Sequence, residues 1–267
     1  MKKICIYIVA GLLFSCGTVP LTGRRQMLLL PDSEVLAIST TQYTDFIKTA
    51  PLSTDKVKTE TVVRVGKRIA KATEAYLKQN RMESEIAGLN WEFNLVKDAH
   101  ANAFCMPGGK IVVYEGLFLL VTSDDELAVV IGHEVAHAIA KHGNERMSQA
   151  LVTQFGATVL SEALNKRSEA VRALGGAVFG LGAQYGVMLP FSRKHEYEAD
   201  YMGLILMTMA GYKPETAVTF WQKMAAGNKD TPPEILSTHP SDAHRIAEIQ
   251  RKLPDTEKYS PEKQANR

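Results

Sequence analysis

The sequence predicts an α+β fold that is mostly helical and contains one small antiparallel sheet. The stretch 124–141 combines a capping box with many apolar side chains, which is typical of a buried helix, and 192–209 indicates a second helix that stops at Gly211. Three short stretches between residues 91 and 114 have the alternation or the apolar character of strands. The length of 267 residues allows one large domain, and no internal repeat is visible.

The N-terminus has the features of a bacterial secretory signal. Lys2 and Lys3 precede an apolar run over residues 4–14, which is too short for a spanning helix of about 20 residues. The run ends in Leu-Phe-Ser-Cys, which resembles a lipobox and would make Cys16 the lipidated first residue. Phe14 is bulkier than the usual residue there. A signal without lipid and an uncleaved anchor therefore stay open as alternatives.

Regular elements can be assigned along the rest of the chain. Strands are expected at 91–95, 101–105 and 110–114, the last two joined by a Pro-Gly-Gly turn. The helix at 124–141 begins with a capping box formed by Ser123 and Glu126, and its acidic first turn suits the helix dipole. The expected helices are 34–48, 61–79, 124–141, 192–209, 214–225 and 241–253.

Residues 173–191 have no clear assignment. They are apolar, rich in glycine and without charged residues. They could form a packed helix pair, a mobile lid or a surface that touches the bilayer. Glycine weakens helices, so a buried segment or a lid is favoured over a membrane span.

The most informative motif is His133-Glu134-Val135-Ala136-His137. Residues four apart lie on one face of a helix, so His133 and His137 can present two imidazoles to one metal ion. Glu134 lies beside them and can accept a proton from a water molecule at the metal. This combination is what zinc-assisted hydrolysis requires. A surface helix with two solvated histidines is the alternative, but the apolar flanks predict burial.

A third metal ligand is expected from the second helix, although its start taken alone could also be a charged, solvated helix end. Glu196 is the best candidate, and Asp200 shares its face and can orient a ligating histidine from behind. Glu198 points elsewhere on this helix and is less suited to be a ligand. The remaining histidines are interpreted as surface or hydrogen-bonded residues: His100, His142, His195 and His244. His244 lies close enough to the segment of His239 to stay open as a rival.

These motifs together resemble zinc metallopeptidase family M forty-eight, which includes HtpX, BepA, LoiP, the Oma-type proteases and the CAAX prenyl proteases. The resemblance rests on the two helical motifs and covers roughly residues 21–252. Four further segments carry it: Thr22-Gly23-Arg24-Arg25-Gln26, Asn102-Ala103-Phe104 with Pro107-Gly108-Gly109, Glu115-Gly116-Leu117, and Thr238-His239-Pro240 with Arg245. The first of these is similar to the start of mature periplasmic members.

The resemblance implies a zincin-type domain in which the small sheet packs on the His-Glu-x-x-His helix. One Zn²⁺ per chain would be bound by His133, His137 and Glu196, with Glu134 as general base and Asp200 orienting a ligand. Asn102 and Ala103 would lie on the strand that pairs with the substrate backbone. His239 and Arg245 would stabilise the oxyanion, although in some relatives a histidine at the position of His239 caps the zinc and silences the enzyme.

Four consecutive parts are expected. They are a lipoprotein signal peptide at 1–15, a lipidated extended tether at 16–34, the zinc metallopeptidase domain at 35–254 and a disordered tail at 255–267. The expected location is the bacterial envelope, with the chain facing the periplasm and the lipid in the outer membrane.

Charge and cysteine usage exclude several other functions. The net charge is +2 and no basic cluster is interleaved with aromatic residues, so no nucleic-acid partner is expected. After loss of Cys5 and lipidation of Cys16, Cys105 alone is left, and a buried inert thiol is expected. A redox metalloprotein is disfavoured because the candidate ligands are hard nitrogen and oxygen atoms.

The sequence therefore favours a membrane-anchored zinc endopeptidase that acts on unfolded or misassembled envelope proteins. Its expected partners are polypeptide substrates, the membrane and the outer-membrane assembly machinery. The alternative is a zinc-stabilised chaperone or assembly factor with little or latent proteolysis.

Overall fold

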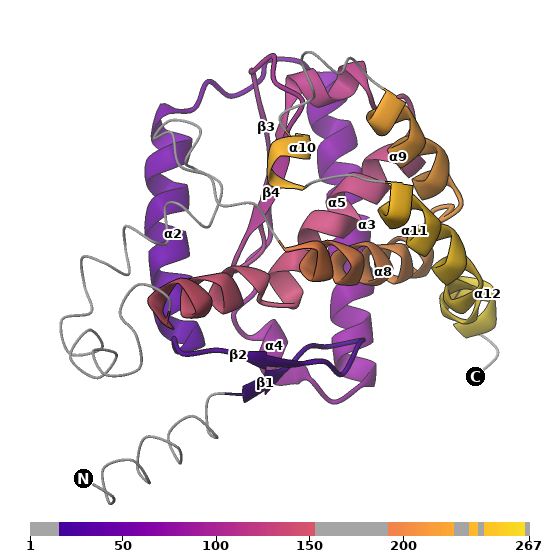
Figure 1. Cartoon of the computed structure of the whole chain (residues 1–267). Coiled ribbons are helices and arrows are strands. Elements are labelled where there is room, and N and C mark those ends of the chain that lie inside the picture. Colours follow the sequence, from indigo (N-terminus) through magenta and orange to yellow (C-terminus); the bar gives the residue numbers. More distant parts are fainter. Residues whose placement is uncertain (1–15, 153–191, 227–234, 240–242, 265–267) are drawn as a thin grey trace, which may run out of the picture.

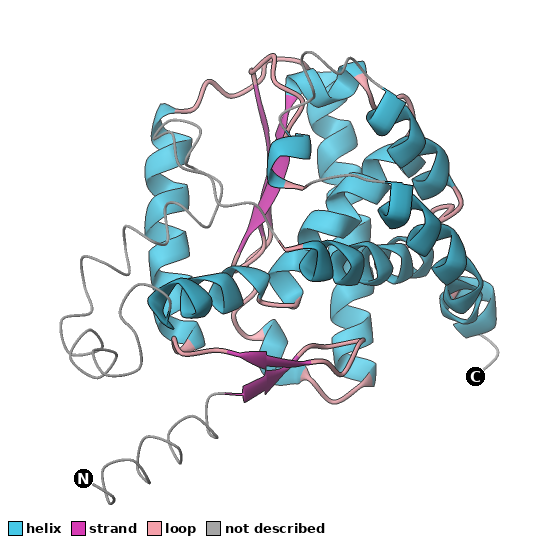
Figure 2. Ribbon diagram, viewed as in Figure 1, coloured by secondary structure: helices cyan, strands magenta, loops and turns pink. Residues whose placement is uncertain are grey.

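The computed structural model describes residues 16–152, 192–226, 235–239 and 243–264 of the chain. Its elements, in chain order, are β1 (Cys16–Thr18), β2 (Arg25–Met27), α2 (Asp32–Thr49), α3 (Lys56–Gln79), α4 (Glu83–Ile86), β3 (Glu92–Val96), β4 (Ala103–Met106), β5 (Lys110–Tyr114), the 3-10 helix η1 (Glu115–Leu119), α5 (Asp124–Ile139), α8 (Arg193–Met209), α9 (Thr216–Ala226), α10 (Ile235–Thr238), α11 (Ala243–Thr256), η3 (Glu257–Tyr259) and α12 (Pro261–Gln264). Residues 142–152 are also helical. The mostly helical α+β class is thus confirmed (Figure 2).

The central sheet separates two apolar layers. Val112 and Tyr114 of β5 pack with α2, whereas Ile111 and Val113 face the larger core that contains α3 and α5. This alternation follows from the two-residue period of a strand. In Figure 1, α2 lies on one side of the strands, and α3, α5 and α8 lie on the other.

The sheet is mixed, so the purely antiparallel arrangement expected from the sequence is wrong. β4 and β5 form the expected antiparallel hairpin, but β3 pairs with β5 in parallel and the strand order is β3-β5-β4. The hairpin turn contains Gly108 and Gly109, both with positive φ, and this turn lets β5 return between its two neighbours. β4 is consequently an edge strand.

Helices α5 and α8 follow the sequence closely. Ser123 caps α5 by accepting a hydrogen bond from the backbone of Glu126, and Ser192 caps α8 in the same way for His195. α8 ends at Met209, and Gly211 follows it with φ 77°. The predicted single helix 124–141 instead ends at Ile139, and Lys141 has φ 56° before the chain turns into the helix at 142–152.

The two helices cross in backbone contact at a pair of glycines. An added Cβ on Gly203 would lie 2.9 Å from the backbone N of His133 and 3.0 Å from the backbone C of Gly132. Neither atom can move away without shifting α5. This close approach brings the part of α5 around His133 against the middle of α8.

The segment assigned as an extended tether is folded against the domain. Residues 16–27 form the β1–β2 hairpin, and Val19, Gln26 and Leu30 are buried. Arg24 forms ion pairs with Glu145 and with a carboxylate on α8, which hold the hairpin in place. The proline and glycine residues therefore form turns within a packed segment. Cys16 as a lipid carrier stays a prediction.

The C-terminal segment is also more ordered than expected. α11 continues to Thr256, which is buried, and η3 and α12 extend the described chain to Gln264. Tyr259 lies against Tyr76 of α3, with ring centroids 6.5 Å apart. Apolar contacts of this kind offset the charged composition on which the prediction of disorder was based. The signal peptide at 1–15 and the segment 173–191 lie outside the described residues.

Within the described ranges, no helix combines the length and apolarity needed to span a bilayer.

We expect Gly203→Ala to destabilise the fold, because its methyl group would push α5 away from α8. Overpacking of this kind costs about 1–3 kcal/mol in the free energy of unfolding. Urea denaturation of the metal-free protein measures the loss. Gly88→Ala is the matched control, because its added methyl would meet only the flexible side chain of Leu36. Equal stability of the two variants would contradict the assigned helix contact.

Candidate metal centre

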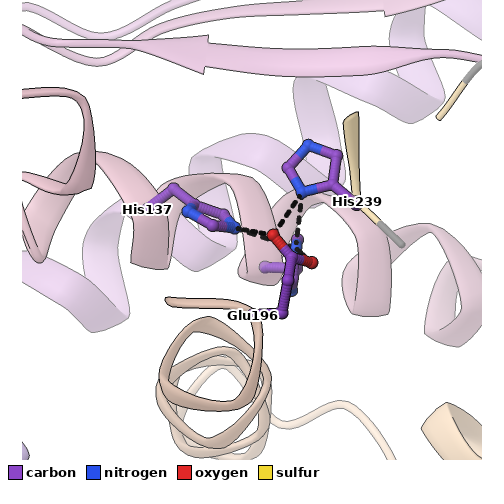
Figure 3. A group of neighbouring side chains, drawn as sticks. His137, Glu196 and His239 are labelled. Carbon is purple, nitrogen blue, oxygen red and sulfur yellow. Dashed lines mark hydrogen bonds and ion pairs between the residues drawn. The ribbon is translucent and has the colours of Figure 1, made fainter. Parts of the chain in front are cut away.

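Four buried side chains from three segments converge on one point. His133 and His137 come from α5, Glu196 from the first turn of α8, and His239 from the residue after α10. Their ligand atoms all lie within 4.8 Å of one another, and none of the four residues is more than 3% exposed. Figure 3 shows Glu196 between the rings of His137 and His239.

The distances within this group fit a tetrahedral metal site. His133 Nε2 lies 3.0 Å from His137 Nε2 and 3.2 Å from His239 Nδ1, and Glu196 Oε1 lies 3.4 Å from His137 Nε2. Ligands about 2.0–2.1 Å from a tetrahedral zinc ion are about 3.3 Å apart. Nitrogen and carboxylate oxygen are also the ligand types that zinc accepts. The residues present therefore fit a zinc ion.

The charge of Glu196 supports the same interpretation. Burial raises the pKa of this carboxyl, but the nearby His239 and the hydrogen bonds from the histidines lower it well below its usual range. Burial lowers the pKa of His137 well below its ordinary value, which favours the neutral form of this imidazole. An ionised carboxylate and a neutral imidazole are the protonation states that bind a metal.

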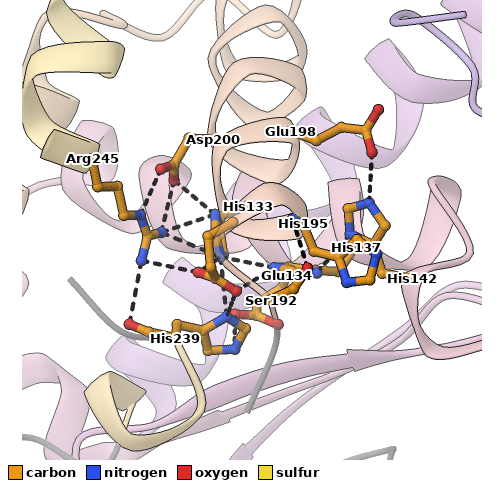
Figure 4. Close-up of polar contacts among 11 residues, drawn as sticks. His133, Glu134, His137, His142, Ser192, His195, Glu198, Asp200, His239 and Arg245 are labelled. Atoms are coloured by element: carbon orange, nitrogen blue, oxygen red, sulfur yellow. Dashed lines mark hydrogen bonds and ion pairs between the residues drawn. The ribbon is translucent and has the colours of Figure 1, made fainter. Parts of the chain in front are cut away.

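Asp200 lies behind His133, as the sequence predicted. Its Oδ1 is 2.9 Å from Nδ1 of His133, so the other ring nitrogen faces the common point (Figure 4). Burial lowers the pKa of His133, and the hydrogen bonds to Asp200 and Glu196 outweigh this and raise it to about 9. Asp200 is therefore placed to fix the orientation of this ring.

Arg245 faces the carboxylates of α8. It binds Asp200 through two hydrogen bonds of 2.5 and 2.7 Å, and it lies 3.0 Å from Glu196. It is 1% exposed, and its guanidinium stacks 3.8 Å from the ring centroid of Trp221. The family resemblance implied that Arg245 would stabilise the oxyanion. Its contacts instead suit a residue that neutralises and holds the two carboxylates.

His142 holds His137 in the way that Asp200 holds His133. The Nδ1 atoms of His142 and His137 are 2.9 Å apart, and Nε2 of His142 lies 3.0 Å from Glu198. His142 is fully buried, and burial lowers its pKa to about 4. Helical periodicity could not reveal this contact, because α5 ends before His142 and the chain turns at Lys141.

The other three histidines are exposed or hydrogen-bonded, as expected. His195 is buried with Nε2 3.0 Å from Glu145, and His100 is exposed beside Asp98. His244 stacks on Tyr197 of α8. None of the three belongs to the group of potential ligands found among the described residues.

Glu134 lies between the potential ligands and the edge strand. Its side chain is 3% exposed, and Oε1 accepts no hydrogen bond from the described residues, with His239 Nε2 at 3.4 Å. Burial raises the pKa of this carboxyl, while the backbone N–H of Cys105 on β4 favours its charged form. A raised pKa suits a group that accepts and then returns a proton.

The predicted substrate strand lies at this edge. Ala103 begins β4, and its N–H donates to the side chain of Asn102, with both residues buried. The carbonyl of Ala101 accepts a hydrogen bond from the N–H of Ile235, the first residue of α10. Burial raises the pKa of the Cys105 thiol well above its ordinary value, as expected for an inert cysteine.

We expect Arg245→Met to lower the free energy of unfolding by about 3–5 kcal/mol, because it leaves Asp200 buried without its cation. Urea denaturation of metal-free protein is the measurement. Arg64→Met is the control, since Arg64 pairs with Asp124 at the surface, where such pairs contribute about 1 kcal/mol or less. A loss no larger than the control's would contradict the assignment of Arg245 as the cation that neutralises Asp200.

Comparison with known proteins agrees with this geometry. The model of Peptidase family M48 matches residues 58–253. The chain is 36% identical to mitochondrial metalloendopeptidase OMA1 of Schizosaccharomyces pombe over 176 residues. These aligned residues cover 65% of this chain and 50% of that protein. The chain is 40% identical over 185 residues to the protein of the same name from Arabidopsis thaliana, covering 66% of this chain and 34% of that protein.

A bacterial relative is matched over more of the chain. The beta-barrel assembly-enhancing protease of Yersinia pestis is 27% identical over 243 residues, which cover 89% of this chain and 48% of that protein. The chain therefore spans between 34% and 50% of the length of these three relatives. Since the family model matches well over half of the sequence, the chain belongs to Peptidase family M48.

Proposed function

We propose that the chain is a zinc-dependent endopeptidase with one zinc ion held by His133, His137 and Glu196. The observation that carries this proposal is the position of Glu134. Its buried carboxylate lies beside the converging ligand atoms and next to an edge strand. A general base, a Lewis-acid site and a backbone template for an extended peptide are thereby brought together.

The roles of the residues follow from their positions. A zinc ion held here would supply Lewis acidity and lower the pKa of a water molecule toward neutrality. Glu134 accepts the proton of the attacking water and delivers it to the leaving amine. Asp200 and His142 fix the two imidazoles from behind, and Arg245 keeps Asp200 and Glu196 in place.

The edge strand indicates the substrate class. A polypeptide that adds to β4 must be extended, so its own backbone hydrogen bonds have to be open. Asn102 and Ala103 stand at the start of that strand. This geometry favours unfolded or misassembled proteins as substrates. Because binding is through the peptide backbone, it selects little among side chains.

We further propose that the protein works in the bacterial envelope, anchored through lipid on Cys16 and facing the periplasm from the outer membrane. The support is the sequence pattern around Cys16 and the similarity to the assembly-enhancing protease of Yersinia pestis. Envelope proteins would be its substrates and the outer-membrane assembly machinery its partner. The chaperone alternative predicts client binding that does not depend on Glu134.

The position of His239 favours a closed resting site. Its Nδ1 lies 3.1 Å from Glu196 Oε1 and 3.2 Å from His133 Nε2, where a fourth ligand would stand. Catalytic zinc sites keep this position for water or substrate. The same segment also covers the start of the edge strand through Ile235. We therefore favour capping by His239 over a role at the oxyanion.

Glu134→Gln is expected to retain zinc and to lower turnover by about 10²–10⁴-fold, the usual contribution of a general acid–base group. Cleavage of an unfolded protein by the full chain and zinc content by atomic emission are the two measurements. Glu60→Gln, at an exposed carboxylate, is the matched control. His137→Ala is expected to lose zinc. Retained turnover in Glu134→Gln would remove Glu134 as the base.

His239→Ala is expected to raise turnover, because it would open the fourth position at the metal. The measurement is the initial rate of cleavage by this variant and by the wild type, both loaded with zinc. It decides between capping of the metal by His239 and stabilisation of the oxyanion. If His239 stabilised the oxyanion, turnover would instead fall by about 10²–10³-fold. His244→Ala, which removes a stacked histidine of the neighbouring helix, is the control.

A further inference from the structure

A continuous chain of polar contacts connects the β1–β2 hairpin to His137, at the ring nitrogen that faces away from the other potential ligands. Nδ1 of His137 lies 2.9 Å from Nδ1 of His142, and Nε2 of His142 lies 3.0 Å from Oε2 of Glu198. The same Oε2 accepts a 2.6 Å hydrogen bond from Nε of Arg24, and Oε1 accepts one of 2.5 Å from Thr22. Figure 4 shows the His137–His142–Glu198 part of this chain.

A second series of contacts also runs from Arg24 to His142. Its two terminal nitrogens bind Glu145 at 3.0 and 2.7 Å, and Glu145 lies 3.0 Å from His195 Nε2. His195 in turn stacks on His142, with ring centroids 4.4 Å apart. Both branches that start at Arg24 thus end on the ring of His142.

The charges explain why an arginine stands here. The side chains of Glu145 and Glu198 are only 8% and 6% exposed, so two carboxylates share a largely buried space with two histidines. Buried carboxylates require a cation. The planar guanidinium of Arg24 supplies this positive charge to both carboxylates at once. It forms hydrogen bonds to three of their four oxygen atoms. A second metal ion is therefore not needed at this cluster.

We propose that Arg24 is a positioning residue for the zinc site and that the β1–β2 hairpin is part of the catalytic domain. The proposal rests on the proposed function, in which His137 binds zinc through Nε2. That bond leaves the hydrogen of His137 on Nδ1, which donates to Nδ1 of His142. His142 must then carry its own hydrogen on Nε2 and donate it to Glu198.

Arg24 fixes the last member of this chain. Its Nε and the hydroxyl of Thr22 bind the two oxygens of Glu198 separately, so the carboxylate cannot rotate away from His142. Without the guanidinium, Glu198 and Glu145 would repel each other and turn toward solvent. His142 would then lose the partner that selects its tautomer, and the ring of His137 would lose its fixed direction.

The test compares the zinc affinity of full-chain Arg24→Ala with that of the wild type, measured by competition with a chromophoric chelator. Loss of an outer-shell partner weakens metal binding by about 10–100-fold. The visible absorption of Co²⁺ bound in place of zinc should change in position and intensity, because it reports ligand geometry. Arg64→Ala, which removes an arginine from an exposed ion pair, should change neither.

A double-mutant cycle with His142→Ala tests the route. If Arg24 acts through His142, the double variant should bind zinc no more weakly than His142→Ala alone. Additive losses would overturn the proposal, as would wild-type affinity and an unchanged Co²⁺ spectrum in Arg24→Ala. If Arg24→Ala does not fold, Arg24→Lys takes its place, because a lysine can keep one of the ion pairs. Failure of the wild type itself to bind zinc would instead overturn the proposed function.

Discussion

The backbone contact between α5 and α8 at Gly132 and Gly203 is the constraint on which the rest of the site depends. Side chains at these positions would hold the helices apart, and the ligand atoms of α5 would no longer meet those of α8. With the contact in place, His133 stands opposite Glu196 and Asp200 at hydrogen-bond distance. The contact therefore turns two separate helical motifs into one metal-binding geometry.

The second requirement is compensation of buried charge. Glu196, Asp200, Glu145 and Glu198 all lie on or against α8, and each is less than 9% exposed. Two arginines far apart in the sequence meet this requirement. Arg245 of α11 binds Glu196 and Asp200, and Arg24 of the N-terminal hairpin binds Glu145 and Glu198. The helices around the site and the terminal segments thus depend on each other, because the buried carboxylates need the two arginines and the arginines are held in place by the carboxylates that they bind.

The sequence predicted the parts of the site that are carried by local periodicity. The four-residue spacing of His133 and His137, the capping serine of α5 and the pairing of Glu196 with Asp200 all depend on one helix at a time. Contacts between distant segments were not visible in this way. His142 follows a chain reversal, Arg24 lies in a segment that was interpreted as a tether, and the parallel pairing of β3 with β5 depends on tertiary order. Thr22-Gly23-Arg24 was noticed only as a resemblance, without a physical role.

X-ray absorption at the zinc edge of the purified full chain tests the central claim most directly. The account predicts one zinc per chain with nitrogen and oxygen ligands at about 2.0–2.1 Å and with the outer-shell scattering of three imidazoles, those of His133, His137 and His239. His239→Ala should remove one imidazole and leave the metal bound. Sulfur at about 2.3 Å, or a chain that binds no zinc, would contradict the assignment of His133, His137 and Glu196 as the metal site.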